Sequence, residues 1–243
     1  MSAPLLEVDE LHVSYGRLRV LQGVSIHVDA GEAVGLLGTN GAGKSTLLKA
    51  VSGVVPSGGG TVRFGGDDLT GASPRRILDA GIVHVPGGRA TFPNLTVAET
   101  LRVGCWPFRR DKGRVEAALD RAFAAFPMLR DRTEQLAGTM SGGQQQMLAV
   151  ARGLLHEPRL LVIDELSLGL APLVTAELIE IVGRIRSTGV ALLLVDQRLA
   201  SAVQATDRAY FLERGAVRFE GPTSDLEARG DLVRSVFLAG GGR

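Results

Sequence analysis

The stretch that most restricts the fold of this 243-residue chain is GTNGAGKST, residues 38 to 46. It continues the apolar run VGLLG and leads into TLLKAVSG, a predicted helix that ends at Gly53. The stretch satisfies GxxxxGK[ST], the phosphate-loop pattern, which requires a strand, a loop and a helix in that order. Such a unit is typical of an α/β fold with a mostly parallel sheet.

The residues of this loop suit a bound triphosphate. Gly38, Gly41 and Gly43 would let the loop wrap phosphates with its backbone amides. Lys44 would neutralise the β and γ oxygens, and Ser45 would ligate Mg²⁺, so ATP and Mg²⁺ are the expected cofactors. The alternative is an ordinary glycine-rich turn, which the flanking strand and helix disfavour. Further nucleotide contacts are expected at Asn40, Ala42 and Thr46.

A second motif, LLVIDE at residues 160 to 165, has four apolar residues that must be buried, followed by two residues with carboxylate side chains. A strand alternates its faces, so Asp164 and Glu165 are expected to point differently and to hold different roles. Asp164 would bind the Mg²⁺ shell, and Glu165 would polarise the water that attacks the γ-phosphate. Because polar residues commonly end strands, this motif alone is weak evidence for a catalytic site. Its presence together with the phosphate loop makes the evidence strong.

A second glycine-rich stretch, SGGQQQ at residues 141 to 146, precedes the predicted helix MLAVARGLLHEP. Ser141 suits a helix start, but Gly142 and Gly143 do not, because glycine costs about 1 kcal/mol relative to alanine in a helix interior. One alternative is merely a loose helix start. The other is that a phosphate approaches the bare amides of this first turn, which also contains Gln144. That phosphate would belong to ATP held by a second chain, with the two chains arranged head to tail.

The remaining segments alternate between strand and helix patterns. LEVDELHVSYG and LQGVSIHVDAG, within residues 5 to 35, alternate apolar and polar residues as half-exposed antiparallel strands do. Residues 94 to 156 are predicted to be mainly helical. We therefore expect one domain over residues 1 to 243, in which residues 1–92 and 157–243 form the nucleotide-binding core with a β subdomain, and residues 93–156 form a helical subdomain.

Composition excludes several classes of protein. The formal net charge of +1 gives no electrostatic case for nucleic acid or for an anionic membrane surface. The single Cys105 excludes an intramolecular disulfide, and the start of the chain lacks signal-peptide features, so a cytoplasmic location is expected. The most hydrophobic segment, VALLLV at residues 190 to 195, is far shorter than the roughly 20 residues that span a bilayer. Any membrane role is therefore expected to come through a partner. No metal-ligand spacing is found among His12, His27, His84 and His156.

Together these motifs resemble the ATP-binding cassette (ABC) family over nearly the whole chain. GTNGAGKST looks like its phosphate loop, MSGGQ like its signature, LLVIDE like its Mg²⁺ and catalytic carboxylates, and SLGLAP at residues 167 to 172 like its dimer-facing loop. The resemblance implies a P-loop NTPase (RecA-like) core with an antiparallel β subdomain and an inserted helical subdomain. It also implies that Tyr15 stacks on adenine, although Leu11, Val13 and Tyr15 share a strand face and could instead be core.

Two positions depart from the general family pattern. Gly87 stands where a glutamine usually touches Mg²⁺, the attacking water and the transmembrane partner. Gln197 stands where a histidine usually holds the γ-phosphate; its amide can donate a hydrogen bond but cannot become positively charged. We expect slower hydrolysis rather than lost binding.

The phrases LSLGLAP and LLLVDQ, with FPNLTVAETL, narrow the resemblance to ATPase subunits of branched-chain amino acid importers of the LivF-like kind. Gly87 departs even from this branch, where glutamate is expected, and Leu166 replaces the usual proline.

The resemblance implies an ATPase at the inner face of the cell membrane. Its implied partners are two transmembrane permease subunits, a second ABC ATPase and, indirectly, a substrate-binding protein. FPNLTVAETLRVG is expected to face a membrane subunit or to be core. The alternatives are a soluble ABC ATPase that acts as an assembly factor, and an exporter ATPase.

Overall fold

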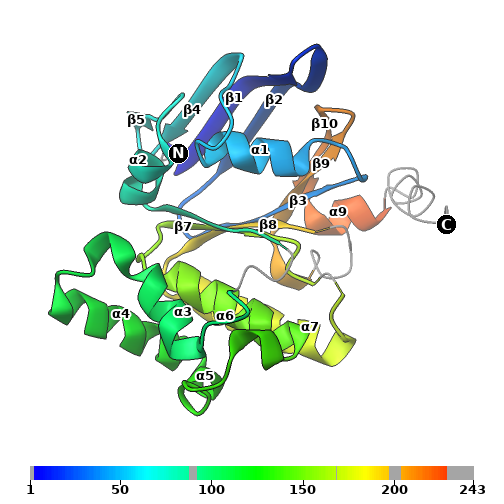
Figure 1. The fold of residues 1–243 in the computed structure, drawn as a ribbon. Helices are drawn as coiled ribbons and strands as arrows, with labels where there is room; N and C mark the ends of the chain where they lie inside the picture. The colour runs from blue at the N-terminus through cyan, green and yellow to red at the C-terminus, as the bar shows by residue number, and fades with distance from the viewer. Residues whose placement is uncertain (1–2, 88–91, 168, 197–203, 229–243) are drawn as a thin grey trace.

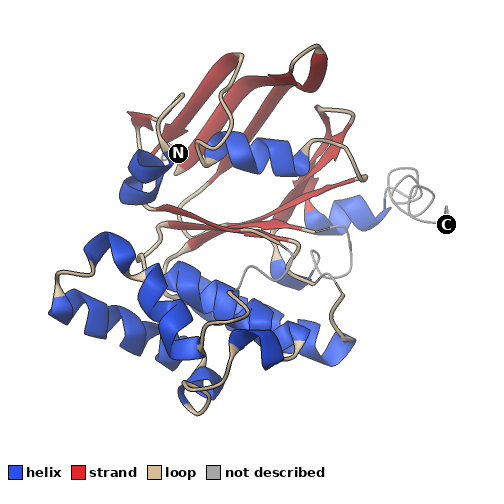
Figure 2. Cartoon of the chain, in the orientation of Figure 1, coloured by secondary structure: helices blue, strands red, loops and turns tan. Residues whose placement is uncertain are grey.

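The computed structural model describes residues 3–87, 92–167, 169–196 and 204–228, and these form two sheets with helices around them (Figures 1 and 2). A four-stranded sheet lies at the top of the view, and a six-stranded sheet crosses the middle. Helix α1 lies between the two sheets, and most of the other helices lie below the six-stranded sheet.

The four-stranded sheet has the order β2-β1-β4-β5, and its pairs are antiparallel. Its strands are β1 (Leu6–Tyr15), β2 (Leu18–Val28), β4 (Gly59–Phe64) and β5 (Asp67–Asp68). Alternate residues of β2 from Val24 onwards are buried, because only one face of this sheet is packed on the core. The alternating sequence pattern therefore correctly predicted two half-exposed antiparallel strands.

The six-stranded sheet has the order β10-β9-β3-β8-β7-β6. Its strands are β3 (Ala33–Gly38), β6 (Ile82–Val85), β7 (Leu160–Asp164), β8 (Ala191–Val195), β9 (Arg208–Glu213) and β10 (Ala216–Pro222). All neighbours pair in parallel except β9 and β10. Strands β3, β8 and β7 are parallel neighbours inside this sheet, so their carboxyl ends lie at the same edge. The residues that follow these three strands are therefore brought together.

Helices cover both faces of this sheet, and the two faces belong to different hydrophobic clusters. Beside the sheet strands, α1 (Lys44–Val51) and α2 (Pro74–Ala80) contribute to the cluster that also contains the four-stranded sheet. The other cluster contains residues of α3 (Val97–Gly104), α4 (Lys112–Ala125), α5 (Pro127–Arg130), α6 (Gly142–Leu154) and α7 (Pro172–Ser187). Alternation within β7 divides Leu160 and Val162 from Leu161 and Ile163 in the same way.

The helix boundaries follow local signals. Helix α3 begins after Thr96, whose side chain and that of Glu99 each accept a hydrogen bond from the other's backbone amide, which is a capping box. Helix α2 begins after Ser73 with a proline in its first turn and ends at Gly81, whose φ is +104°. Short elements complete the fold: η1 (Trp106–Phe108), η2 (Ala137–Thr139) and α9 (Thr223–Ala228).

Candidate nucleotide-binding site

The phosphate loop connects the end of β3 to the start of α1. The buried Lys44 lies in the first turn of α1, and its Nζ donates hydrogen bonds to the carbonyls of Gly38 at 2.7 Å and Thr39 at 2.9 Å. Burial lowers the pKa of Lys44, while the nearby carboxylates of Asp164 and Glu165 act in the opposite direction. The lysine is therefore held against the loop backbone, beside the place where a phosphate would enter.

Two glycines of the loop are required by its geometry. A Cβ atom on Gly38 would overlap the backbone carbonyl of Leu212 in the neighbouring strand. Gly43, with φ of +107°, is the N-cap of α1, a conformation that side chains disfavour. The rest of the predicted loop is graded in exposure: Asn40, Gly41 and Ser45 are exposed, Thr46 is half-buried, and Ala42 is buried.

Asp164 ends β7 beside the phosphate loop, and Ser45 Oγ donates to its Oδ2 at 3.5 Å, a long hydrogen bond. Burial and the negative charge of Glu165 raise the pKa of Asp164, while Lys44 opposes the shift. A hydroxyl and a carboxylate are hard oxygen donors, so this pair fits a Mg²⁺ ion. Within the described residues no group of three or more His, Cys, Asp and Glu could hold a metal, so the remaining ligands would be phosphate oxygens and water.

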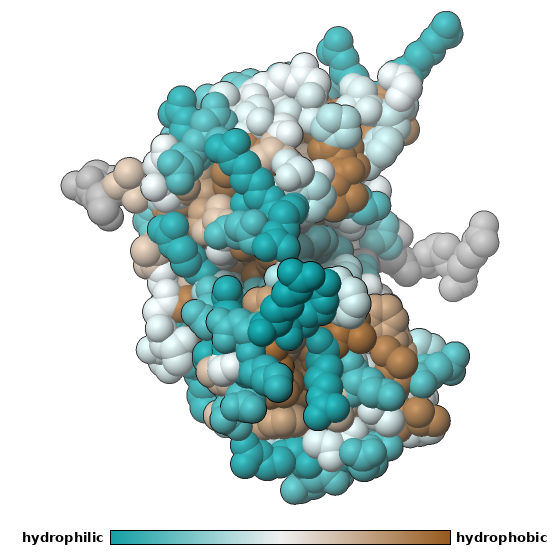
Figure 3. Space-filling view, turned by 60° about the vertical axis from the view of Figure 1, so that its left-hand side comes forward, coloured by the Kyte–Doolittle hydropathy of each residue, from teal (hydrophilic) through white to brown (hydrophobic). Residues whose placement is uncertain are grey.

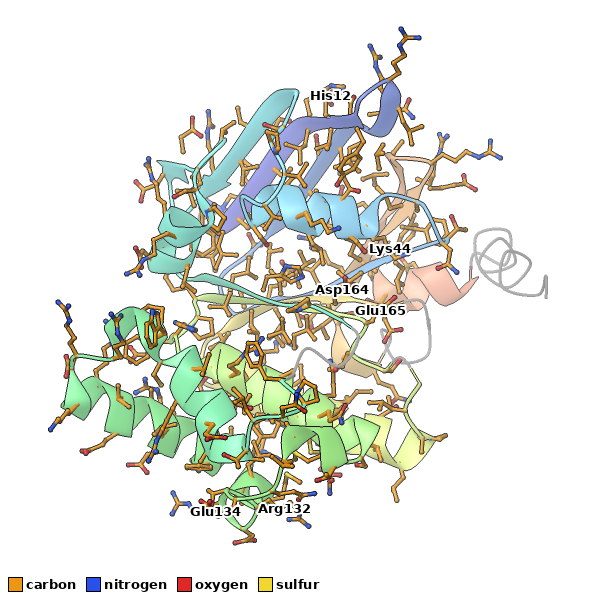
Figure 4. The ribbon with its side chains drawn as sticks, in the orientation of Figure 1. His12, Lys44, Arg132, Glu134, Asp164 and Glu165 are labelled. Atoms are coloured by element: carbon orange, nitrogen blue, oxygen red, sulfur yellow. The ribbon has the colours of Figure 1, made fainter. Side chains whose placement is uncertain are left out.

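Glu165 lies just after β7, in a turn with φ of +53°, and its backbone amide donates to the carbonyl of Val195 at 2.7 Å. We expected strand alternation to separate Asp164 from Glu165, and that reason was wrong. The strand ends at Asp164, so Glu165 lies outside it, in a bend with a left-handed backbone conformation. Lys44, Asp164 and Glu165 lie close together where the central strands end, whereas His12, Arg132 and Glu134 lie at the periphery (Figure 4).

Gly87 lies against these carboxylates. A Cβ atom at this position would stand 3.0 Å from Glu165 Oε2, from Glu165 Cβ and from the carbonyl oxygen of Asp164. The predicted site therefore includes this position, but as a close backbone approach rather than as a side-chain contact. The other departure from the family pattern, Gln197, lies outside the described residues.

The sequence motifs did not identify one acidic residue at the edge where β3, β8 and β7 end. Asp196 is 5% exposed, follows β8 directly, and its Oδ2 accepts a hydrogen bond of 2.7 Å from Ser167 Oγ. Its charge also acts on the pKa values of both Lys44 and Asp164. The signal was the acidic end of LLLVD, a buried strand like LLVID. Without knowledge that the two strands are neighbours, that acidic residue could not be assigned to this site.

The signature stretch begins α6 as predicted, and its first turn has a capping box. Ser141 N donates to Gln144 Oε1 at 3.0 Å, and Gln144 N donates to Ser141 Oγ at 3.3 Å. The two glycines differ. Gly142 is exposed, while Gly143 is buried, and a Cβ on it would overlap the side chain of Val174 in α7. Helix packing therefore explains Gly143, and only Gly142 leaves backbone open to an approaching group.

Within the chain, the signature and the phosphate loop are separated by the six-stranded sheet. Helix α1, which begins at the phosphate loop, packs on one face through Leu47 and Leu48, and α6 packs on the other through Leu148 and Val150 (Figure 1). The starts of the two helices are thus presented by different layers of the molecule.

Tyr15 lies at the end of β1 and is 46% exposed, whereas Leu11 and Val13 are fully buried. The interpretation of Tyr15 as a core residue was therefore wrong. Its ring is accessible, and adenine contact stays a prediction.

A phosphate loop at the end of a central parallel strand, with a lysine, a serine and carboxylates converging on it, defines a P-loop nucleotide-binding protein. Residues 21–167 match the sequence profile of the ABC transporter family. The chain therefore belongs to this family, and it is an ATP-binding, ATP-hydrolysing member of it. Solved structures agree on the fold: the ADP conformation of an ATP-binding cassette of an ABC transporter superposes with a TM-score of 0.88 at 24% identity, covering 98% of this chain and 99% of that one.

Sequence relatives confirm the resemblance to the importer branch. The chain is 41% identical to the high-affinity branched-chain amino acid transport ATP-binding protein BraG of Pseudomonas aeruginosa over 236 residues. This alignment covers 97% of this chain and 100% of BraG. It is 33% identical over 223 residues to the probable branched-chain amino acid transport ATP-binding protein LivF of Archaeoglobus fulgidus, covering 91% and 94% of the two chains. No helix among the described residues is long and apolar enough to cross a membrane.

Proposed function

We propose that this chain is the ATP-binding and ATP-hydrolysing subunit of a membrane importer for branched-chain amino acids or related amides. The observation that carries this proposal is the identity of 41% to BraG over essentially the full length of both proteins. Full-length coverage matters because the segments outside the phosphate loop and the signature, which distinguish branches of the family, are included in the match.

In this proposal the residues at the edge of the central strands share the work on ATP. Lys44 leaves the carbonyls of Gly38 and Thr39 and binds the β- and γ-phosphates. Ser45 and Asp164 hold Mg²⁺, which would neutralise phosphate charge when bound. Glu165 accepts the proton of the attacking water, which is the role of a positioned general base. The support is the convergence of these side chains, including the hydrogen bond between Ser45 and Asp164.

We propose further that two ATPase chains meet head to tail, so that Ser141, Gly142 and Gln144 of one chain contact the ATP bound by the other. Support comes from the placement of α1 and α6 on opposite faces of the sheet, since a signature so placed needs a nucleotide from another chain. ATP then supplies the contacts that favour the closed pair over the open one. Gly87 and Gln197 lack the usual side chains, so the natural partner is a sister ATPase with a more usual set.

The membrane partners would be two permease subunits, served by a substrate-binding protein on the other side, with this chain at the inner face of the membrane. The segment predicted to face a permease exposes apolar side chains: Phe92 is 45% exposed and Val103 is 43% exposed. Nearby in the sequence, Trp106 is 62% exposed. Hydrophobic residues reach the surface of the helical half of the molecule between hydrophilic ones (Figure 3). Exposed aromatic residues of this kind are enriched at protein interfaces.

The test is an affinity purification of the chain from detergent-solubilised native membranes in ATP, using Glu165→Gln to hold the closed state, followed by mass spectrometry. We expect two multi-span proteins and a second ABC ATPase. Lys44→Ala is the matched control, because it removes the phosphate contact and should lower recovery of the second ATPase. Recovery of soluble partners alone would contradict the importer and favour an assembly factor.

A further inference from the structure

Two hydrogen bonds attach the loop that follows β7 to the end of β8, where their acceptors are the consecutive residues Val195 and Asp196. The backbone amide of Glu165 donates to the carbonyl of Val195 at 2.7 Å, and Ser167 Oγ donates to Asp196 Oδ2, also at 2.7 Å. Ser167 is fully buried, and Asp196 is 5% exposed. A buried hydroxyl bonded to a carboxylate is among the stronger hydrogen bonds of a protein, and it fixes the position of both groups.

Asp196 also occupies a central position in the site. Strand β8 lies between β3, which ends at the phosphate loop, and β7, which ends at Asp164. The carboxylate of Asp196 is close enough to act electrostatically on both Lys44 and Asp164. The residue that holds Ser167 therefore stands between the phosphate loop and the acidic end of β7.

The loop held in this way continues to the signature. After Ser167 it passes Gly169, where φ is +70°, and reaches Leu170 and Val174. A Cβ atom on Gly142 would be in ordinary contact with Leu170 at 3.6 Å, and one on Gly143 would overlap Val174. The segment from Glu165 to Val174 thus contacts β8 at one end and the start of α6 at the other.

We propose that Asp196 is a positioning residue for ATP hydrolysis, acting through its hydrogen bond with Ser167. The bond fixes the turn that presents Glu165 and, through the same segment, the approach of the loop to the start of α6. This proposal rests on the assignment of Glu165 as general base, and it does not depend on what the transporter carries.

The test compares Asp196→Ala, Asp196→Asn and Ser167→Ala in the full chain, purified with the subunits that accompany it. We expect kcat to fall between about tenfold and a hundredfold in the two alanine variants, because small misplacements of a catalytic group cost this much. The Kd for ATP should change less than about threefold, since binding energy resides in the phosphate loop. Asp196→Asn should retain most of kcat, because an amide oxygen can still accept from Ser167.

A second readout separates positioning from general loss of structure. Hydrogen exchange of nucleotide-free protein should become faster in residues 165–172 of Asp196→Ala and Ser167→Ala, while α1 keeps its protection. The double variant should be no slower in turnover than either single variant, because both remove one bond. The control is Thr223→Val, which removes a buried hydroxyl bonded to Thr206 near the opposite edge of the sheet and should leave kcat unchanged.

Three results would overturn the proposal: an unchanged kcat in the alanine variants, additive losses in the double variant, or an Asp196→Asn variant as slow as Asp196→Ala. Failure of the proposed function is distinguishable from these, because Glu165→Gln would then retain ATP turnover or the purified complex would contain no permease.

Discussion

At the scale of single residues, the site contains close approaches between glycine backbone and the acidic side chains. Gly87 shows this most directly, because its Cα lies where any Cβ would stand 3.0 Å from Glu165 Oε2. Sequence comparison alone presents this position as a missing side chain. In the structure the position is also a limit on where the Glu165 carboxylate can lie.

We therefore predict that Gly87→Ala lowers ATP turnover more than ATP affinity. The added methyl group displaces the Glu165 side chain, while the phosphate loop keeps its contacts with the nucleotide. Steady-state kcat and an equilibrium Kd for ATP measure the two effects separately. The matched control is Gly183→Ala in α7, where a Cβ meets nothing within 4 Å, so turnover should not change.

Turnover that stays the same or rises in Gly87→Ala would contradict this account of the position. The control also carries an expectation of its own. Gly183 lies inside a helix, so alanine there should stabilise the protein by about 0.5–1 kcal/mol.

Residues whose chemistry is tied to a continuous motif were predictable from the sequence. Lys44 and Ser45 follow from the phosphate-loop pattern, and in the structure Ser45 donates a long hydrogen bond to Asp164. Asp196 was not predictable, because its role depends on β8 lying between β3 and β7, an order that the chain does not state. Tyr15 was ambiguous for a similar reason: a strand pattern does not show where the neighbouring strand stops covering it.

At the scale of elements, the start of α6 combines two requirements that the sequence could not separate. Both glycines fit the expectation of a phosphate close to the backbone. In the structure, however, Gly143 is buried against Val174 of α7, and Gly142 alone is exposed. The packing of α6 on α7 therefore restricts one glycine whatever the role of the other.

This difference predicts opposite outcomes for two alanine substitutions. Gly143→Ala should lower the free energy of unfolding by about 1–3 kcal/mol, because its methyl group overlaps Val174 in a packed interior. Gly142→Ala should be close to neutral for folding, since its Cβ would be 3.6 Å from Leu170. Urea unfolding of the two variants measures the difference.

A second substitution checks the cause. Val174→Ala in the Gly143→Ala background should restore part of the lost stability, because it removes the atoms with which the new methyl group collides. If Gly143→Ala is as stable as the parent, or if Val174→Ala gives no rescue, the packing explanation is wrong.

Element boundaries were predictable where capping and punctuation residues occur. The capping box of Thr96 and Glu99 and the glycine stop at Gly81 appear in the sequence as ordinary local signals. The end of β7 was less predictable. LLVIDE does not reveal that the backbone turns to a φ of +53° at Glu165, because glutamate has no preference for that conformation.

At the scale of the whole molecule, the six-stranded sheet separates the two helix starts for which we propose phosphate contacts. The start of α1 is on the side that packs against the four-stranded sheet, and the start of α6 is on the side formed by the helices. The class of fold followed from the phosphate loop and the alternation of strands and helices. The separation itself required the structure, because strand order decides which face each helix covers.

If this chain powers uptake of branched-chain amino acids, substitutions at its phosphate site should change transport in cells that express the protein. Uptake of radiolabelled leucine, isoleucine and valine would be compared between the parent strain and strains carrying Lys44→Ala or Gly183→Ala. Lys44→Ala removes the ammonium group at the phosphate site, while Gly183→Ala leaves that site intact.

We predict that high-affinity uptake of at least one of these amino acids is lost in Lys44→Ala and kept in Gly183→Ala. Undiminished uptake of all three in Lys44→Ala, with the variant protein present at the parent level, would contradict it.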